Sequence, residues 1–171
     1  MPRRRRLRRA ANRRAPDVDT PGSPLAFVQN RAGRRGVPTA RSFDAWVRAA
    51  LGAKPGKRRQ VNVVLFRPRE ARALNRRYRA RDYATNVLSF PYEPLPREKS
   101  ALLGDLVICP SVVAREAREQ GKPVRDHFAH LTVHGVLHLL GFDHENPDDA
   151  ARMERREVRI LAGLGIGNPY D

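Results

Sequence analysis

The chain has 171 residues and a formal net charge of +16 at pH 7, from 34 lysines and arginines against 18 acidic residues. The length fits one domain with its own core, the single cysteine excludes an intrachain disulfide framework and favours a reducing compartment, and no apolar run approaches the roughly 18 residues of a membrane span. So large a positive charge indicates a polyanionic partner, with nucleic acid or an acidic membrane surface as the first candidates.

The N-terminus carries most of this charge. The first 35 residues hold eleven arginines and two aspartates, so they contribute +9 and leave +7 for the rest of the chain. There is no apolar stretch typical of a secretory signal, and there is only one serine where an organellar transit peptide would have several. We expect residues 1–23 to form a disordered, arginine-rich arm, either a solvated tail or a polyanion-binding segment.

The rest of the sequence alternates short β-branched runs with amphipathic stretches, separated by prolines and glycines. In chain order we expect strand 25–28, helix 39–51, strand 60–66, helix 69–79, strand 86–90, strand 102–109, helix 111–120, helix 123–140 and helix 148–161. Pro91 is expected to cut off the third strand, and Ala73, Leu74 and Arg77 give the second helix its spacing. The pattern predicts an α+β fold with a single domain over 24–171, in which helices pack on a small mixed sheet of about four strands.

Three histidines in the predicted helix 123–140 and the turn after it have the spacing of a metal site. His134 and His138 are four residues apart, so they share one helical face, and Gly141 allows the chain to turn so that His144 can return as a third ligand. Three imidazoles around Zn²⁺ leave a fourth position for water, which is typical of catalytic rather than structural zinc. Zinc in such a site would lower the pKa of its water from 15.7 towards about 7.

The same spacing occurs in zinc peptidases with the H-E-x-x-H-x-x-G-x-x-H pattern, but Gly135 stands where their catalytic glutamate would be. A peptidase without that proton acceptor would lack its general base. The glycine would allow a large group to approach the metal, although close helix packing also explains it. The sequence therefore predicts a zincin-like histidine helix without the peptidase chemistry.

Two further histidines, His127 and His130, precede these ligands in the same predicted helix. His130 lies one turn before His134 and is a candidate to support the ligands from behind. The simpler expectation for both is an exposed position on the helix.

A second charged segment, 75–82, places four arginines in six positions ahead of a predicted buried strand. A solvated helix face and a phosphate clamp are both compatible with this composition. In the second case the guanidinium groups would hold phosphate oxygens and stabilise developing charge, and Tyr78 could stack on a base.

Three separated motifs together resemble one protein family. They are the run Leu74–Arg79 with Arg81-Asp82 and Thr85–Phe90, the run Gly104–Ile108, and the histidine stretch His134–His144. In this order they are similar to the YbeY family of bacterial endoribonucleases and rRNA-maturation factors. The likeness covers roughly 25–171 and excludes the arginine-rich arm.

The resemblance implies a cytoplasmic bacterial enzyme with one zinc ion that acts on single-stranded RNA, matures the 3′ end of small-subunit rRNA and takes part in ribosome quality control. Its partners would be rRNA, the small ribosomal subunit and its assembly factors, and no membrane. The metal ligands fall on His134, His138 and His144 and the functional arginine on Arg79. Arg76, Arg77, Tyr78 and Arg81 are further candidates for RNA contact. Ala80 and Ala84 depart from the glycine and proline usual in the family.

The chemistry expected from these residues is metal-assisted hydrolysis of a phosphodiester, with Arg79 holding the scissile phosphate. The sequence does not choose between water and the RNA 2′-OH as the nucleophile. A non-enzymatic, rRNA-binding assembly factor with structural zinc is the alternative function, and a metallopeptidase is a third that Gly135 disfavours.

Overall fold

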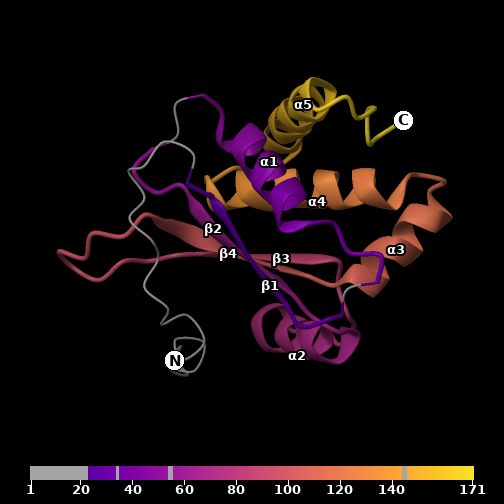
Figure 1. Ribbon diagram of the computed structural model, residues 1–171, viewed down its shortest axis with the longest axis horizontal. Coiled ribbons are helices and arrows are strands. Elements are labelled where there is room, and N and C mark those ends of the chain that lie inside the picture. Colours follow the sequence, from indigo (N-terminus) through magenta and orange to yellow (C-terminus); the bar gives the residue numbers. More distant parts are fainter. Residues whose placement is uncertain (1–22, 34, 54–55, 144–145) are drawn as a thin grey trace.

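The computed structural model describes residues 23–171 apart from 34, 54–55 and 144–145, and shows a mixed sheet with helices on both faces (Figure 1). The elements are β1 (Ala26–Asn30), α1 (Ala40–Leu51), β2 (Gln60–Leu65), α2 (Pro68–Arg79), β3 (Val87–Pro91), β4 (Leu102–Ile108), α3 (Pro110–Glu119), α4 (Val124–Leu139) and α5 (Pro147–Gly163). This confirms the predicted α+β class. The predicted arm lies outside the described residues, except for Ser23.

The four strands run in the order β1-β2-β4-β3. The pairs β1–β2 and β2–β4 are parallel, and β3 is antiparallel to β4 at the edge of the sheet. Pro91 belongs to β3 and pairs with Gly104, so the prediction that the strand stops before it is wrong by one residue. An edge strand tolerates proline because the missing N–H can face away from the ladder.

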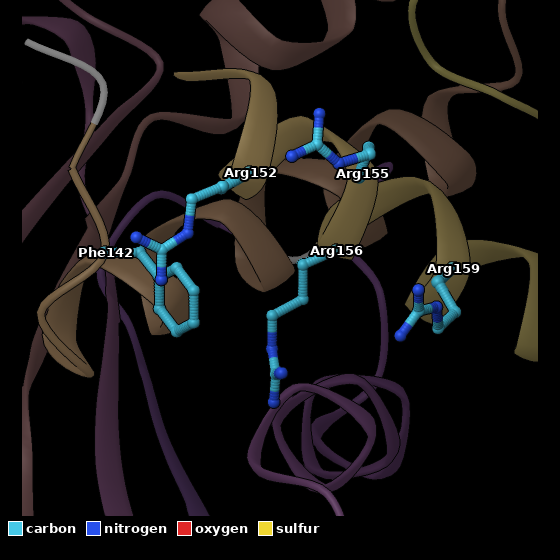
Figure 2. A pocket seen from close by; sticks show the side chains of 5 residues that line it. All are labelled: Phe142, Arg152, Arg155, Arg156 and Arg159. Carbon is cyan, nitrogen blue, oxygen red and sulfur yellow. The ribbon is translucent and has the colours of Figure 1, made fainter. Parts of the chain in front are cut away.

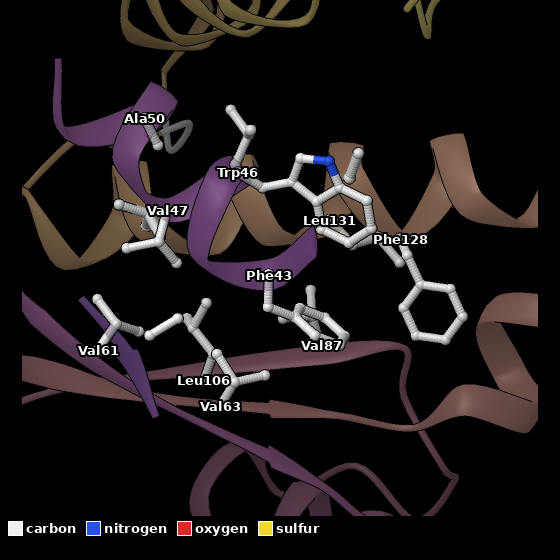
Figure 3. Close-up of a cluster of buried hydrophobic side chains, with 14 of the residues drawn as sticks. Phe43, Trp46, Val47, Ala50, Val61, Val63, Val87, Leu106, Phe128 and Leu131 are labelled. Atoms are coloured by element: carbon white, nitrogen blue, oxygen red, sulfur yellow. The ribbon is translucent and has the colours of Figure 1, made fainter. Parts of the chain in front are cut away.

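The main core lies between the sheet and the pair α1 and α4 (Figure 3). Phe43 and Trp46 of α1 are fully buried there, and Phe43 makes edge-to-face contacts with Trp46 and with Phe128 of α4, at centroid distances of 5.3 and 6.1 Å. Helix α2 lies on the opposite side of the sheet (Figure 1). Its buried residues are Ala71 and Asn75, since the helix packs on a small second cluster with Cys109 and Val112.

Helix α4 is the central helix of the domain. Ten of its sixteen residues are buried, as expected for a helix covered on several sides by α1, α3, α5 and the sheet. Two glycines bring it close to β3 and β4. A Cβ at Gly135 would lie 2.7 Å from Cδ2 of Leu106 in β4, and one at Gly104 would lie 2.7 Å from Cδ2 of Leu139 in α4. The histidines of α4 therefore sit next to the edge strand.

Candidate metal centre

Four histidines form a stripe along α4. His127, His130, His134 and His138 follow each other at intervals of three, four and four residues, which keeps them on one side of the helix. Their rings form a continuous series, with centroid distances of 6.2, 6.2 and 4.6 Å between neighbours. The end of this stripe nearest the helix C-terminus holds the two predicted ligands.

A buried carboxylate from α5 contacts two of these histidines. Oε1 of Glu157 lies 2.6 Å from Nδ1 of His134, and Oε2 lies 3.2 Å from Nε2 of His130. The hydroxyl of Tyr170, in the C-terminal tail, donates a hydrogen bond to Oε2. Burial alone would raise the pKa of Glu157, but the hydrogen bonds from His130 and His134 outweigh it and lower the pKa to about 2. Glu157 is therefore a carboxylate at neutral pH although it is only 1% exposed.

The donor atoms fit a metal ion. His130, His134 and Glu157 each offer a ligand atom within 4.8 Å of the others, so this group could bind a metal. The Nε2 atoms of His134 and His138 are also only 3.1 Å apart. Two imidazole nitrogens on one tetrahedral zinc, each at 2.0–2.1 Å, would be separated by about 3.4 Å. Because the carboxylate at Nδ1 of His134 holds the proton there, it leaves Nε2 with a lone pair for the ion.

The predictions for the other three histidines, His127, His130 and His144, turn out differently. His144 lies outside the described residues. The expectation that His127 and His130 lie exposed on the helix is wrong. His130 is only partly exposed and contacts Glu157. His127 is 5% exposed and pairs with Oε2 of Glu116 at 3.0 Å, because α3 packs on this part of α4.

Gly135 does not face the ligands. A Cβ at this position would meet the side chain of Leu106 and would lie 3.2 Å from the hydroxyl oxygen of Ser89. A larger residue here would enter the packing between α4 and the sheet. Of the two explanations for this glycine, close helix packing is the one that the structure supports.

The arginine segment lies at the end of α2 and is exposed to solvent. Ala80, which ends the helix, adopts the left-handed conformation with φ of 56°. The segment reaches the edge strand through Tyr78, whose ring packs edge-on against Phe90 of β3 at a centroid distance of 5.0 Å. The neighbouring Ser89 donates a hydrogen bond of 3.2 Å to the carbonyl of Gly135. Strand β3 thus connects the end of α2 with the turn of α4 that carries His134.

Other arginines of the segment contact neighbouring tyrosines. The guanidinium of Arg77 lies 5.6 Å from the centre of the Tyr78 ring, and Arg81 donates to the hydroxyl of Tyr83 at 3.1 Å. Arg76 and Arg79 belong to the last turn of α2, where positive charge is favourable at the helix C-terminus. The exposed guanidinium groups can still donate to an anion.

Sequence reasoning missed Glu157 and Tyr170. One signal was present for Glu157, since it lies four residues after Met153 and four before Leu161 and therefore on the apolar side of α5. An acid at such a position needs a buried partner. No local pattern could have identified Tyr170, because its contact joins the C-terminal tail to α5.

Fold and site define a single α+β domain with a histidine-based site for a metal beside an edge strand. Residues 27–165 match the family described as Endoribonuclease YbeY. The chain is 54% identical over 156 residues to the Endoribonuclease YbeY of Alkalilimnicola ehrlichii, covering 89% of this chain and 93% of the relative. It is 56% identical over 143 residues to that of Stenotrophomonas maltophilia strain R551-3, covering 80% and 87%.

The chain belongs to the endoribonuclease YbeY family, a family of hydrolases that cleave RNA, and the resemblance given by the sequence motifs is confirmed. The solution structure of TM1509 from Thermotoga maritima aligns with a TM-score of 0.48 and 23% identity, over 82% of this chain and 92% of that one. Among the described helices, none combines the length and the apolar character needed to cross a membrane.

Proposed function

We propose that the chain is a zinc-dependent endoribonuclease specific for single-stranded RNA, with His134, His138 and His144 as the ligands of one zinc ion. One observation carries this proposal: the Nε2 atoms of His134 and His138 are 3.1 Å apart while Glu157 holds Nδ1 of His134. This brings one nitrogen of each imidazole to the same point and fixes the ring orientation of His134 from behind. His130 and Glu157 are assigned to support the ligands, not to bind the ion.

Zinc bound there would polarise a phosphate oxygen and lower the pKa of a coordinated water. The chain's own residues position the RNA. Arg79, at the end of α2, would hold the scissile phosphate and offset the charge that develops on it. Arg76, Arg77 and Arg81 would contact flanking phosphates, and Tyr78 would offer its ring to a base.

Two attacking groups are compatible with this site. Attack by the 2′-OH leaves a 2′,3′-cyclic phosphate, whereas attack by water leaves a 5′-phosphate and a 3′-OH. Glu157 contacts the Nδ1 side of His134 and therefore does not serve as the general base on the Nε2 side. Identifying the end groups of the cleavage products therefore shows whether the 2′-OH or water attacks.

In the cell, we propose that the substrate is ribosomal RNA. The enzyme would mature the 3′ end of small-subunit rRNA and act in ribosome quality control, with the small subunit and its assembly factors as partners in a bacterial cytoplasm. Membership of the family supports this assignment. The domain boundary follows from it as well: 24–171 would be the catalytic domain and 1–23 a separate basic arm.

The test is cleavage of a labelled single-stranded RNA by the purified, zinc-loaded chain, compared with the His138→Ala variant. The proposal predicts cleavage by the wild type and its loss in the variant. Arg41→Gln, an exposed substitution on α1, serves as a matched preparation control. Tight RNA binding without cleavage by the wild type would support a non-enzymatic assembly factor instead, and equal cleavage by His138→Ala would indicate a contaminating nuclease.

A further inference from the structure

Helix α5 carries a row of arginines on the side opposite Glu157. Arg152, Arg155, Arg156 and Arg159 recur at intervals of three, one and three residues, so they share one exposed face about 10 Å long. All four lie beyond the first turn of the helix, where the positive end of the helix dipole no longer acts on them. We call these four residues the α5 arginine face.

The α5 arginine face borders a hollow of about 250 Å³. Its lining consists of the four arginines and Phe142, from the segment that follows α4 (Figure 2). The guanidinium of Arg156 lies 5.2 Å from the centre of the Phe142 ring, a stacking that orients its donors. Among the described residues no carboxylate belongs to this lining, so four positive charges face one small volume.

Neighbouring acids neutralise only part of this charge. Arg152 pairs with Asp149 at 3.6 Å, but both side chains are exposed and such a pair is weak. Glu154 lines the adjoining hollow together with Arg155, Arg159 and Tyr170. Within the part of the chain that the structure describes, Arg155 and Arg159 have no ion-pair partner.

The position of this face relates it to the candidate metal centre. Tyr170, which borders the second hollow, donates to Glu157, and Glu157 contacts His134. Phe142, which borders the first, follows the turn at the end of α4 four residues after His138. The face itself lies on the side of α5 that points away from Glu157, and on a different element from the arginines of α2, which lie across the sheet (Figure 1).

We propose that the α5 arginine face is a second RNA-binding surface, which holds the phosphate backbone of a single-stranded RNA outside the cleavage site. Guanidinium groups fit this ligand because each can donate two hydrogen bonds to one phosphate. A row of separate arginines suits a repeating anion better than a single small one. This inference rests on the proposed function, which supplies the RNA, but it concerns binding and not cleavage.

The test uses the full chain and a labelled single-stranded RNA of about 20 nucleotides, with affinity measured between about 50 and 200 mM salt. The variant combines Arg152→Gln, Arg155→Gln and Arg159→Gln and spares the stacked Arg156. Its matched control combines Arg41→Gln, Arg115→Gln and Arg118→Gln, three exposed arginines on α1 and α3. The RNA is recovered and sized after each titration, so that binding is read on intact strands.

Each phosphate contact on a single strand contributes about 0.7 to the slope of log affinity against log salt. The proposal predicts that the α5 variant loses up to about 2 from this slope and at least about tenfold in affinity at about 50 mM salt, while the control keeps the wild-type values. Far-UV circular dichroism and melting verify the fold. Should the triple variant melt at a lower temperature than the wild type, Arg155→Gln with Arg159→Gln is used, with an expected loss of up to about 1.4 in slope.

An unchanged slope in the α5 variant overturns the proposal, and so does an equal loss in the control, which would mean that only net charge matters. Binding of the wild type and the α5 variant to vesicles containing phosphatidylglycerol is measured as well. Vesicle binding that the α5 variant alone loses, with RNA binding intact, would assign the face to a membrane surface instead and overturn the proposal. Failure of the wild type to cleave RNA would overturn the proposed function and leave this binding result standing.

Discussion

Nδ1 of His134 lies 2.6 Å from Oε1 of Glu157, and this contact joins the central helix α4 to the last helix α5. The carboxylate is buried, accepts a hydrogen bond from the hydroxyl of Tyr170 and lies against His130 as well. Such an arrangement fixes the tautomer and the orientation of the imidazole. We therefore expect substitutions at Glu157 to act on metal affinity.

Replacing Glu157 by Gln tests this positioning role. Removal of a hydrogen-bonded carboxylate behind a ligand typically lowers metal affinity about 10–100-fold. We expect the dissociation constant for zinc to rise by this factor, measured by competition with a chromophoric chelator, with one zinc per chain still bound at saturating metal. Glu154→Gln, an exposed position on the same helix, should leave the affinity unchanged. A saturated stoichiometry of zero would instead make Glu157 a ligand.

Ala80 should cost stability, because it takes a left-handed conformation with φ of 56° at the end of α2. This conformation is about 1–2 kcal/mol unfavourable for residues other than glycine. We expect Ala80→Gly to increase the free energy of unfolding by about 1 kcal/mol in urea denaturation, since the greater freedom of glycine in the unfolded chain offsets part of the gain.

Ala45→Gly provides the opposite control. Ala45 is an exposed residue inside α1, where glycine should destabilise the chain by about 1 kcal/mol. Destabilisation by both substitutions would contradict the left-handed conformation at residue 80.

Gly104 allows α4 to approach the edge of the sheet. A Cβ there would lie 2.5 Å from the carbonyl oxygen of Phe90 and 2.7 Å from Cδ2 of Leu139. Since a backbone atom is involved, Gly104→Ala should separate β3 from β4 and lower the free energy of unfolding by about 2–3 kcal/mol. Gly167→Ala is the control, because a Cβ at that position would have no neighbouring atom within 4 Å among the described residues. Equal stability of the two variants in chemical denaturation would contradict the close packing.

Asp44 links α1 to the start of β1 and should make stability depend on pH. Its carboxylate accepts from the backbone N–H groups of Leu25 and Ala26 and from Nε of Arg48, at 2.5, 3.0 and 2.6 Å. Burial would raise the pKa of Asp44, but the hydrogen bonds from Arg48 and the two backbone groups lower it below its ordinary value. The charged form is therefore favoured by folding.

Because the folded-state pKa is lowered, this stabilisation is fully present above the unfolded pKa of about 3.9 and is lost as the pH falls through the folded value. We expect Asp44→Asn to cost about 1–2 kcal/mol at pH 7 and progressively less below about pH 4, by denaturation at each pH. Asp82→Asn, which removes an exposed pair with Arg72, should have little effect at either pH. A cost for Asp44→Asn that stays constant as the pH is lowered below about 4 would contradict the role of its charge.

The sequence predicted every strand and helix of the described residues to within a few positions, because prolines and glycines mark their boundaries and the apolar periodicity between them is strong. The prediction fails where tertiary packing decides which residues are buried. The sequence also did not predict that Ala71 and Asn75 are the buried residues of α2, because the helix lies on the opposite face of the sheet from the main core. His127 is buried by α3, whose position no local pattern contains.

The candidate site also contains residues that the sequence predicts and residues that only the fold brings there. The spacing of His134 and His138 could be read directly, because a four-residue interval defines a helical face. Glu157 and Tyr170 could not, because they reach the site from segments 23 and 36 positions after His134, and only the packing of α5 and the tail brings them there. The periodicity of the α5 arginine face is also present in the sequence, but its relation to the site depends on the fold.

The most direct measurement is the zinc content of two purified variants, His138→Ala and His130→Ala, with RNA cleavage measured on the same samples. Our account makes His138 a ligand and His130 a support. It therefore predicts that His130→Ala retains about one zinc per chain and cleaves RNA, whereas His138→Ala loses both the metal and the cleavage. One zinc per chain in His138→Ala, together with none in His130→Ala, would contradict it and place the ion between His130, His134 and Glu157.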